Sequence, residues 1–334
     1  MQPTALRAAA DTGVRRMDGE FVTREPGFMS ATRLRGQEGP GSPSSWREEG
    51  IMATGQHNRD ENDGAYGSRE AAEGWRRGAA ERARYLGPAT ETMLEVASIG
   101  IGSRVLDVAA GTGEQTLMAA RRVGPSGSVL ATDIAAEMLK ITAEAAHQAG
   151  LSNVTTRVMD AQQLVVEPES FDAAISRLGL MFIPDLQGAL TSIRRALKPG
   201  GKLAAIVVSS AEKNRYLALP LEIGCRHGRR PASALDGIGV FSLGSPAVLE
   251  TAFMKAGFSN VTVQAAPTRR RFASRAEAVQ DKRNSCPEVG DLMADLSDAE
   301  REMAWAEIEQ AISQFEGPNG VDVPGELLIG AGTK

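Results

Sequence analysis

The chain has 334 residues, of which 42% are hydrophobic, so it is long enough to bury a sizeable core. Its formal net charge of −5 does not favour a nucleic-acid or anionic-membrane surface. No run approaches the roughly 18 apolar residues of a membrane span. Only two cysteines, Cys225 and Cys286, are present, far apart and without metal-ligand spacing. They indicate a reducing compartment, which we expect to be the cytoplasm, with no disulfide framework and no metal site.

Residues 1–68 are rich in Gly, Pro, Ser, Arg and Glu and show no sustained apolar period. Residues 36–45 have a linker composition that cannot bury enough surface to fold. The segment lacks the apolar core of a secretory signal, and its acidic residues argue against a transit peptide. We therefore expect residues 1–68 to be a disordered N-terminal extension, and Met52 is an alternative start of the protein.

Regular structure is expected to begin near Arg69. Apolar residues between Ala71 and Ala97 predict two helices, and the pair Gly87–Pro88 predicts the break between them. These helices make up a predicted N-terminal segment of residues 69–100.

The segment Val105–Thr116, with the sequence VLDVAAGTGEQT, is the most informative part of the chain. It has the pattern of a buried strand, a glycine turn and the start of a helix. Glycine lets the backbone approach a ligand closely because no Cβ intervenes. Twenty residues past Gly113, a second apolar run ends in Asp133, an offset at which an acid accepts hydrogen bonds from ribose hydroxyls. The pattern predicts an adenosine-containing cofactor on a doubly wound α/β domain.

Two residues disfavour a dinucleotide. Thr116 stands where the dinucleotide fingerprint has its third glycine. Asp107 lies inside the strand just before the turn, where a carboxylate would repel a pyrophosphate but would suit the ammonium of an amino-acid group. A dinucleotide-dependent oxidoreductase therefore remains only as a weaker alternative.

The rest of the chain alternates strand and helix patterns. Helices are expected at about 114–122, 135–149, 185–198 and 246–256, and strands near 104–108, 128–132, 154–158, 171–176, 202–208, 260–264 and 326–332.

At this point the chain resembles the class I S-adenosylmethionine-dependent methyltransferases, and among them the ubiquinone/menaquinone C-methyltransferases, from about Trp75 to Lys334. Five stretches in the family's order carry the resemblance: 105–116, 158–161, 170–182, 196–203 and 325–332. It implies a Rossmann-like sheet of seven strands, mostly parallel with the last strand antiparallel, in a core of residues 101–208 and 246–334. It also implies that the helices of residues 69–100 fold across the cofactor as a flap.

The resemblance implies S-adenosylmethionine as the cofactor, bound by acids at strand ends and by neighbouring loop and flap residues. The residues expected to contact it are Asp107, Ala109, Gly111, Thr112, Gly113, Gln115, Thr116, Asp133, Ile134, Met138, Asp160, Ala161, Arg177 and Trp75. Each acid alone is explained equally well as a turn or helix cap. Because all three follow predicted parallel strands, the cofactor interpretation is favoured.

Two inserts, residues 209–245 and 267–323, interrupt the core after the fifth and sixth strands. Both project from the sheet end where open α/β sheets bind ligands, so we expect a helical cap that encloses the methyl acceptor and excludes water.

The implied reaction is displacement at the sulfonium methyl group, in which orientation of the acceptor supplies much of the rate. A general base helps only where the acceptor must lose a proton, and the catalytic residues remain unknown. His227 and Tyr216 are weak candidates, although a surface position for His227 is favoured. Glu222, Tyr216 and Arg177 are candidate acceptor contacts. Residues 269–271, three arginines, are more simply explained as a solvated strand edge.

Two sub-classes are disfavoured by what is missing. Two distant cysteines do not suit an arsenite methyltransferase, and residues 176–179 do not have the motif of methyltransferases that act on base or glutamine nitrogens. The expected activity is methylation of carbon, oxygen or nitrogen in a small, partly apolar metabolite, with a phenolic or enolic acceptor favoured. A non-catalytic, cofactor-binding regulatory subunit is the alternative, and a homodimer stays open.

Overall fold

Eight strands form one mixed sheet in the computed structural model, which describes residues 68–231 and 239–334. Apart from Ser68, the N-terminal extension lies outside the described residues. The strands are β1 (Arg104–Val108), β2 (Ser128–Asp133), β3 (Val154–Val158), β4 (Phe171–Arg177), β5 (Leu197–Val208), β6 (Ser259–Phe272), β7 (Glu316–Gly317) and β8 (Gly320–Thr333).

The strand order is β3-β2-β1-β4-β5-β8-β6, with the short β7 paired to β8. Strands β1 to β5 run parallel to one another, whereas β8 runs antiparallel to both β5 and β6. The expected doubly wound fold with an antiparallel last strand is therefore confirmed. The strand order reverses between β1 and β4, and open α/β sheets bind ligands at such a point, beyond the carboxyl ends of the strands.

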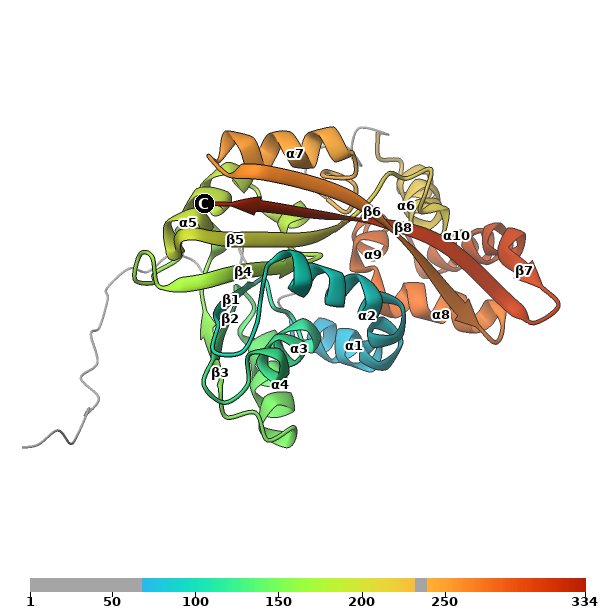
Figure 1. Cartoon of the computed structure of the whole chain (residues 1–334). Coiled ribbons are helices and arrows are strands. Elements are labelled where there is room, and N and C mark those ends of the chain that lie inside the picture. The colour runs from blue at the N-terminus through green and yellow to red at the C-terminus, as the bar shows by residue number, and fades with distance from the viewer. Residues whose placement is uncertain (1–67, 232–238) are drawn as a thin grey trace, which may run out of the picture. The chain divides into compact units, whose positions relative to one another are not determined.

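Helices cover both faces of the sheet (Figure 1). One face carries α2 (Ala79–Val96), α3 (Glu114–Val123) and α4 (Ala136–Gln148), while α5 (Leu186–Ala196) and α7 (Pro246–Lys255) pack on the other. The central strands are consequently buried on both sides and are continuously apolar, as in residues 203–207 of β5. This burial makes the sheet a rigid base for the loops at its carboxyl end.

The first two helices differ from expectation. Helix α1 (Arg69–Arg77) ends at Gly78, and α2 runs without interruption through Gly87 and Pro88. The predicted break was wrong because Leu86, Met93 and Leu94 of α2 are buried in the main core, and this packing outweighs the local cost of proline.

The second insert also differs from expectation at both ends. Residues 267–272 continue β6 and residues 320–323 begin β8, so a long antiparallel ribbon extends past the main sheet. Around it lie α6 (Arg215–His227), α8 (Arg275–Ser285), α9 (Pro287–Leu292) and α10 (Asp298–Ile312), with short 3₁₀ turns η1 (Ala161–Gln163), η2 (Leu180–Phe182) and η4 (Ser313–Phe315) elsewhere. We call α6, α8, α9, α10 and the ribbon the cap.

The cap has a hydrophobic core of its own. Phe272 and Val321, paired at the far end of the ribbon, pack with Val289 of α9 and Ile308 of α10. Tyr216 of α6 joins the same core and contacts the Phe272 ring. The cap is therefore a packed structure and not a set of loose loops.

Candidate active site

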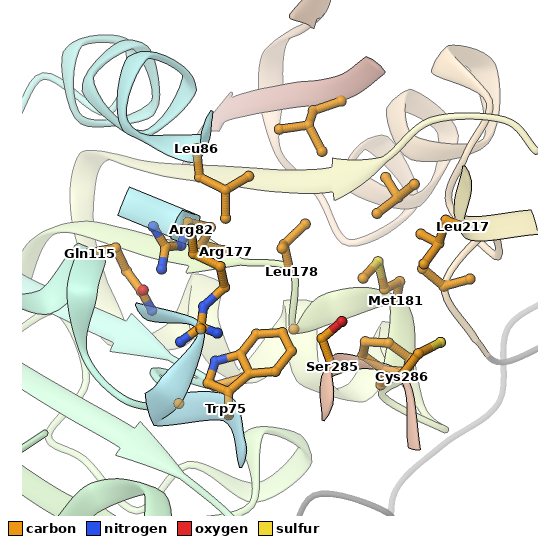
Figure 2. Close-up of a pocket in the computed structure, with 18 of the residues that line it drawn as sticks. Trp75, Arg82, Leu86, Gln115, Arg177, Leu178, Met181, Leu217, Ser285 and Cys286 are labelled. Carbon is orange, nitrogen blue, oxygen red and sulfur yellow. The ribbon is translucent and has the colours of Figure 1, made fainter. Parts of the chain in front are cut away.

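A cavity of about 530 Å³ begins at the carboxyl ends of β1, β2 and β4 and continues to the cap. Figure 2 shows its two ends, with Trp75, Gln115 and Arg177 gathered at one and Met181, Ser285 and Cys286 at the other. Leu178 lies between them. The volume of the cavity falls within the range of small-molecule sites, which is about 300–1,000 Å³.

The turn after β1 forms the floor of the first end. Gly111 and Gly113 have positive φ values of 57° and 84°. A Cβ on Gly113 would lie 2.6 Å from the Thr142 side chain, so only glycine allows this turn to pack on α4. Two non-glycine residues of the lining, Ala109 and Leu178, also have positive φ, 55° and 61°. Such strained backbone concentrates at binding sites.

Asp133 ends β2 beside this turn. Its carboxylate accepts hydrogen bonds from the backbone N–H groups of Gly111 and Ala135, at 2.8 and 2.9 Å. Burial raises the pKa of Asp133, and these backbone donors only partly oppose the rise. The residue therefore caps the chain locally and also lines the cavity, so the two interpretations of this acid are compatible.

Asp107 does not line the cavity. It is fully buried in β1, where it accepts hydrogen bonds from Thr116 Oγ1 at 2.5 Å and Gln115 Nε2 at 3.3 Å. Burial raises its pKa to about 7 against the effect of these hydrogen bonds. In this structure Asp107 holds the first turn of α3 against β1, and Gln115 in turn lines the cavity.

Asp160 follows β3 and lines the cavity near Asp133. One of its oxygens accepts from the backbone N–H of Gln162 at 2.8 Å, and the Gln162 amide also donates to the carboxylate. This places a third acid at the carboxyl edge of the sheet, after the strand next to β2.

Sequence reasoning missed a charged cluster at the start of α3. The Glu114 carboxylate pairs with Arg82 of α2 at 2.6 Å and with Arg177 of β4 at 2.8 Å. Burial alone would raise the pKa of Glu114, but the two guanidinium groups outweigh it and hold that pKa below its usual range. All three residues line the cavity, and together they bear one net positive charge.

Trp75 of α1 closes this end of the cavity. The Arg82 guanidinium lies 4.1 Å from the centroid of its ring. Helix α1 packs against both α4 and α8, so it connects a helix of the main sheet with the cap. That the helices of residues 69–100 fold across the cofactor as a flap stays a prediction from the family resemblance.

The other end of the cavity combines apolar side chains with a charged cluster. Asp281 of α8 pairs with Arg270 of β6 through two hydrogen bonds, at 2.6 and 3.0 Å, and accepts from the Tyr216 hydroxyl at 3.1 Å. Lys282 is almost completely buried beside them. Burial raises the pKa of Tyr216, and Asp281 adds to the rise, so this hydroxyl is a poor general base.

The remaining candidates lie elsewhere. His227 is not part of the lining, and its Nε2 lies 2.7 Å from a carboxylate oxygen of Glu307 at the α6–α10 contact. Glu222 pairs with Arg215. In the arginine run, Arg269 and Arg271 are exposed and face Asp322, as expected for a solvated edge, but Arg270 between them points into the cavity.

The cofactor candidates divide into two groups. Those that line the cavity are Trp75, Ala109, Gly111, Gln115, Asp133, Ile134, Met138, Asp160, Ala161 and Arg177. Asp107, Thr112, Gly113 and Thr116 lie behind it and support the turn or the start of α3. The sequence pattern predicts residues of both groups because the residues of the glycine turn and the residues that support it lie close together in the chain.

Within the described part of the chain, no group of three or more His, Cys, Asp or Glu residues is arranged to hold a metal ion. Cys225 and Cys286 are free and buried. No helix among the described residues is both long and apolar enough to span a membrane.

Comparison with known proteins identifies the class. Residues 105–201, which include the glycine turn and the three acids, match the family described as methyltransferase domain. The resemblance to class I S-adenosylmethionine-dependent methyltransferases that was drawn from the sequence is thereby confirmed. S-adenosylmethionine is the cofactor of that class.

Among individual proteins, the chain is similar to methyltransferases of quinone biosynthesis. The ubiquinone/menaquinone biosynthesis C-methyltransferase of Pseudomonas aeruginosa (strain LESB58) is 37% identical over 122 residues, which are 36% of this chain and 48% of the relative. The demethylmenaquinone methyltransferase of Listeria welshimeri is 39% identical over 108 residues, 32% of this chain and 46% of the relative. The chain thus spans about half the length of the curated relatives it matches.

Solved structures show the same fold. A methyltransferase structure from Bacillus halodurans C-125 has a TM-score of 0.52 at 17% identity and covers 73% of this chain and 98% of its own. The YcgJ protein of Bacillus subtilis has a TM-score of 0.51 at 16% identity, with 74% and 98% covered. At these identities the likeness concerns the fold alone.

Proposed function

We propose that the protein transfers a methyl group from S-adenosylmethionine to a small, partly apolar metabolite through a phenolic or enolic oxygen or carbon. The observation that carries this proposal is the continuity of one cavity. It joins the glycine turn and the strand-end acids to an apolar chamber beneath the cap. The two unpaired cysteines suit a cytoplasmic location.

The residues present fit the cofactor. Gly111 brings backbone without a Cβ to the cavity wall, and Asp133 offers a carboxylate acceptor where ribose hydroxyls bind in sheets of this kind. Asp160 provides a further acceptor after the next strand. When bound, S-adenosylmethionine supplies the activated methyl group on its sulfonium.

The chain's own contribution is to orient the acceptor and exclude water. Leu178 presents apolar surface between the two ends of the cavity, and Met181 and Leu217 present it at the cap end. The cap and α1 cover this space, which holds the acceptor in the low-dielectric interior where orientation is most effective.

The test is calorimetric titration with S-adenosylmethionine, S-adenosylhomocysteine and NAD. We expect the first two to bind at micromolar concentration and NAD not to bind. Asp133→Ala should abolish binding, whereas an Asp295→Ala variant on the exposed cap surface should bind normally. Transfer of a radiolabelled methyl group to a panel of phenols and enols then tests turnover. Binding of NAD alone would overturn the proposal, and cofactor binding without transfer to any acceptor would favour a regulatory subunit.

A further inference from the structure

In the charged cluster at the cap end of the cavity, the Lys282 ammonium makes no short hydrogen bond to the Asp281 carboxylate that it faces. Arg270 occupies both oxygens of Asp281. Lys282 Nζ lies 3.5 Å from Asp281 Oδ2 and 4.4 Å from the centroid of the Tyr216 ring. Neither is a short charge-assisted hydrogen bond, for which N···O distances are about 2.7–2.9 Å. Two cations thus share one carboxylate.

Burying this ammonium is costly. Lys282 is 3% exposed, and burial removes the water that solvates a cation, which is unfavourable unless a partner compensates. Burial lowers the pKa of Lys282, and Asp281 only partly opposes this. An ammonium carries three donors, and at this site it lines a cavity large enough for a ligand. An anionic ligand group would compensate the buried charge.

Four other ionisable groups lie near Lys282 or Arg270. The Tyr216 hydroxyl donates to Asp281, and Tyr85 lines the cavity beside the Arg270 guanidinium. Cys286 is held as the thiol, because burial and the neighbouring Glu288 raise its pKa to about 12. Glu288 is a second carboxylate of the lining, and it is hydrogen-bonded to that thiol.

We infer that Lys282 binds the acceptor as its oxyanion, so that the substrates of this enzyme are phenols or enols acidic enough to ionise in the cavity. The O–H bond of the acceptor breaks, the electron pair stays on oxygen beside the ammonium, and the proton passes to bulk water as the acceptor binds. No general base is then required, which accords with the positions of His227 and Tyr216. This inference rests on the proposed function, because it assigns the acceptor of that reaction.

The experiment uses 4-nitrophenol, whose anion absorbs visible light, and its methyl ether 4-nitroanisole, which has a similar shape but cannot ionise. Both are titrated into the full chain saturated with S-adenosylhomocysteine. We expect wild-type protein to bind the phenol at least tenfold more tightly than the ether. Bound 4-nitrophenol should ionise at a pH at least one unit below that of the free probe.

Variants assign the effect to the ammonium. Lys282→Met should abolish the preference for the phenol and raise the ionisation pH of the bound probe by at least one unit, while Lys282→Arg should retain both properties. Lys255→Met, at an exposed lysine of α7, is the matched control and should behave as wild type. Binding of S-adenosylhomocysteine by each variant shows that the fold is intact.

The outcomes separate the two proposals. Failure of wild-type protein to bind S-adenosylhomocysteine would overturn the proposed function. Normal binding of S-adenosylhomocysteine together with equal affinity for phenol and ether, or no affinity for either, would overturn only the role of Lys282. Because that comparison needs wild-type protein alone, it remains decisive even if Lys282→Met does not fold.

Discussion

The carboxylate of Asp107 is buried and hydrogen-bonded within the protein. The sequence suggested that its carboxylate would meet the ammonium group of the cofactor, but the side chain bonds Thr116 and Gln115 and does not reach the cavity wall. Its raised pKa has a consequence for stability. Between the usual pKa of 3.8 and the folded-state value of about 7, the folded protein holds a proton that the unfolded chain has released. The stability contributed by this site therefore falls as the pH rises through that range.

Replacement of Asp107 by asparagine removes this titration. We expect the stability of wild-type protein, relative to Asp107→Asn, to fall by about 2–3 kcal/mol between pH 5 and pH 8, since one pKa unit corresponds to about 1.4 kcal/mol. Urea unfolding at both pH values measures the difference. The exposed control Asp298→Asn should show no comparable change. A constant difference between wild type and Asp107→Asn would contradict the prediction.

At this scale the sequence predicted residues that share one local motif and missed those brought together by folding. The strand-end acids follow predicted strands, so their common edge could be inferred. Glu114 pairs with Arg82 and Arg177, which lie 32 and 63 residues away along the chain, and no local pattern indicates such pairings. The same holds for Lys282, which the sequence shows only as one charge in a polar helix.

Helix α2 shows how tertiary packing overrides a local signal. Pro88 lacks the N–H that a helix interior needs, and Gly87 before it is a poor helix former, so a break was the reasonable prediction. The helix continues because its buried face packs on β4, β5, β6 and β8. Its local sequence therefore opposes the structure that its packing stabilises.

Substitution in this helix should accordingly increase stability. Pro88→Ala restores the missing donor, and we expect a gain of about 2 kcal/mol after allowing for the larger entropy of the unfolded chain. Gly87→Ala should gain about 1 kcal/mol, since a Cβ there meets no atom within 4 Å. Thermal and urea unfolding measure both. Lower stability of Pro88→Ala would mean that the proline ring makes packing contacts worth more than the hydrogen bond.

Elements with strong local patterns matched their predicted ranges closely, and the largest error came from long-range pairing. Strand β1 was expected at 104–108 and spans those residues. Strand β6 was expected to end near residue 264 but continues to Phe272. That extension depends on pairing with β8, about 50 residues away, and on the ion pair of Arg270 with Asp281, whereas composition alone assigns Arg270 to solvent.

The two largest hydrophobic cores among the described residues lie in the sheet and in the cap. If the first holds the cofactor and the second shapes the acceptor chamber, damage to each should have a different functional effect. Ile193 of α5 and Ile308 of α10 are matched probes, since both are fully buried isoleucines.

Truncation of either residue to alanine should cost about 2–5 kcal/mol of stability. For Ile308→Ala we expect the KM for the acceptor to rise while the Kd for S-adenosylhomocysteine stays within twofold of wild type. Ile193→Ala should lower stability without that selective rise in KM. Calorimetry and steady-state kinetics at a temperature where both variants are folded provide the comparison, and an equal loss of cofactor affinity in Ile308→Ala would argue against separate roles.

Because residues of β6 and β8 line the cavity, the length of the cavity depends on the length of these two strands. Thr268 and Arg270 face the cavity, while Arg269 and Arg271 face solvent, because side chains alternate along a strand. Adding one residue to each strand would turn Arg270 toward solvent and break its ion pair with Asp281. A neighbouring arginine would then face the cavity. Adding two would preserve the alternation and move the far end of the cap by about 7 Å. Related enzymes that accept longer substrates should therefore differ here by even numbers of residues.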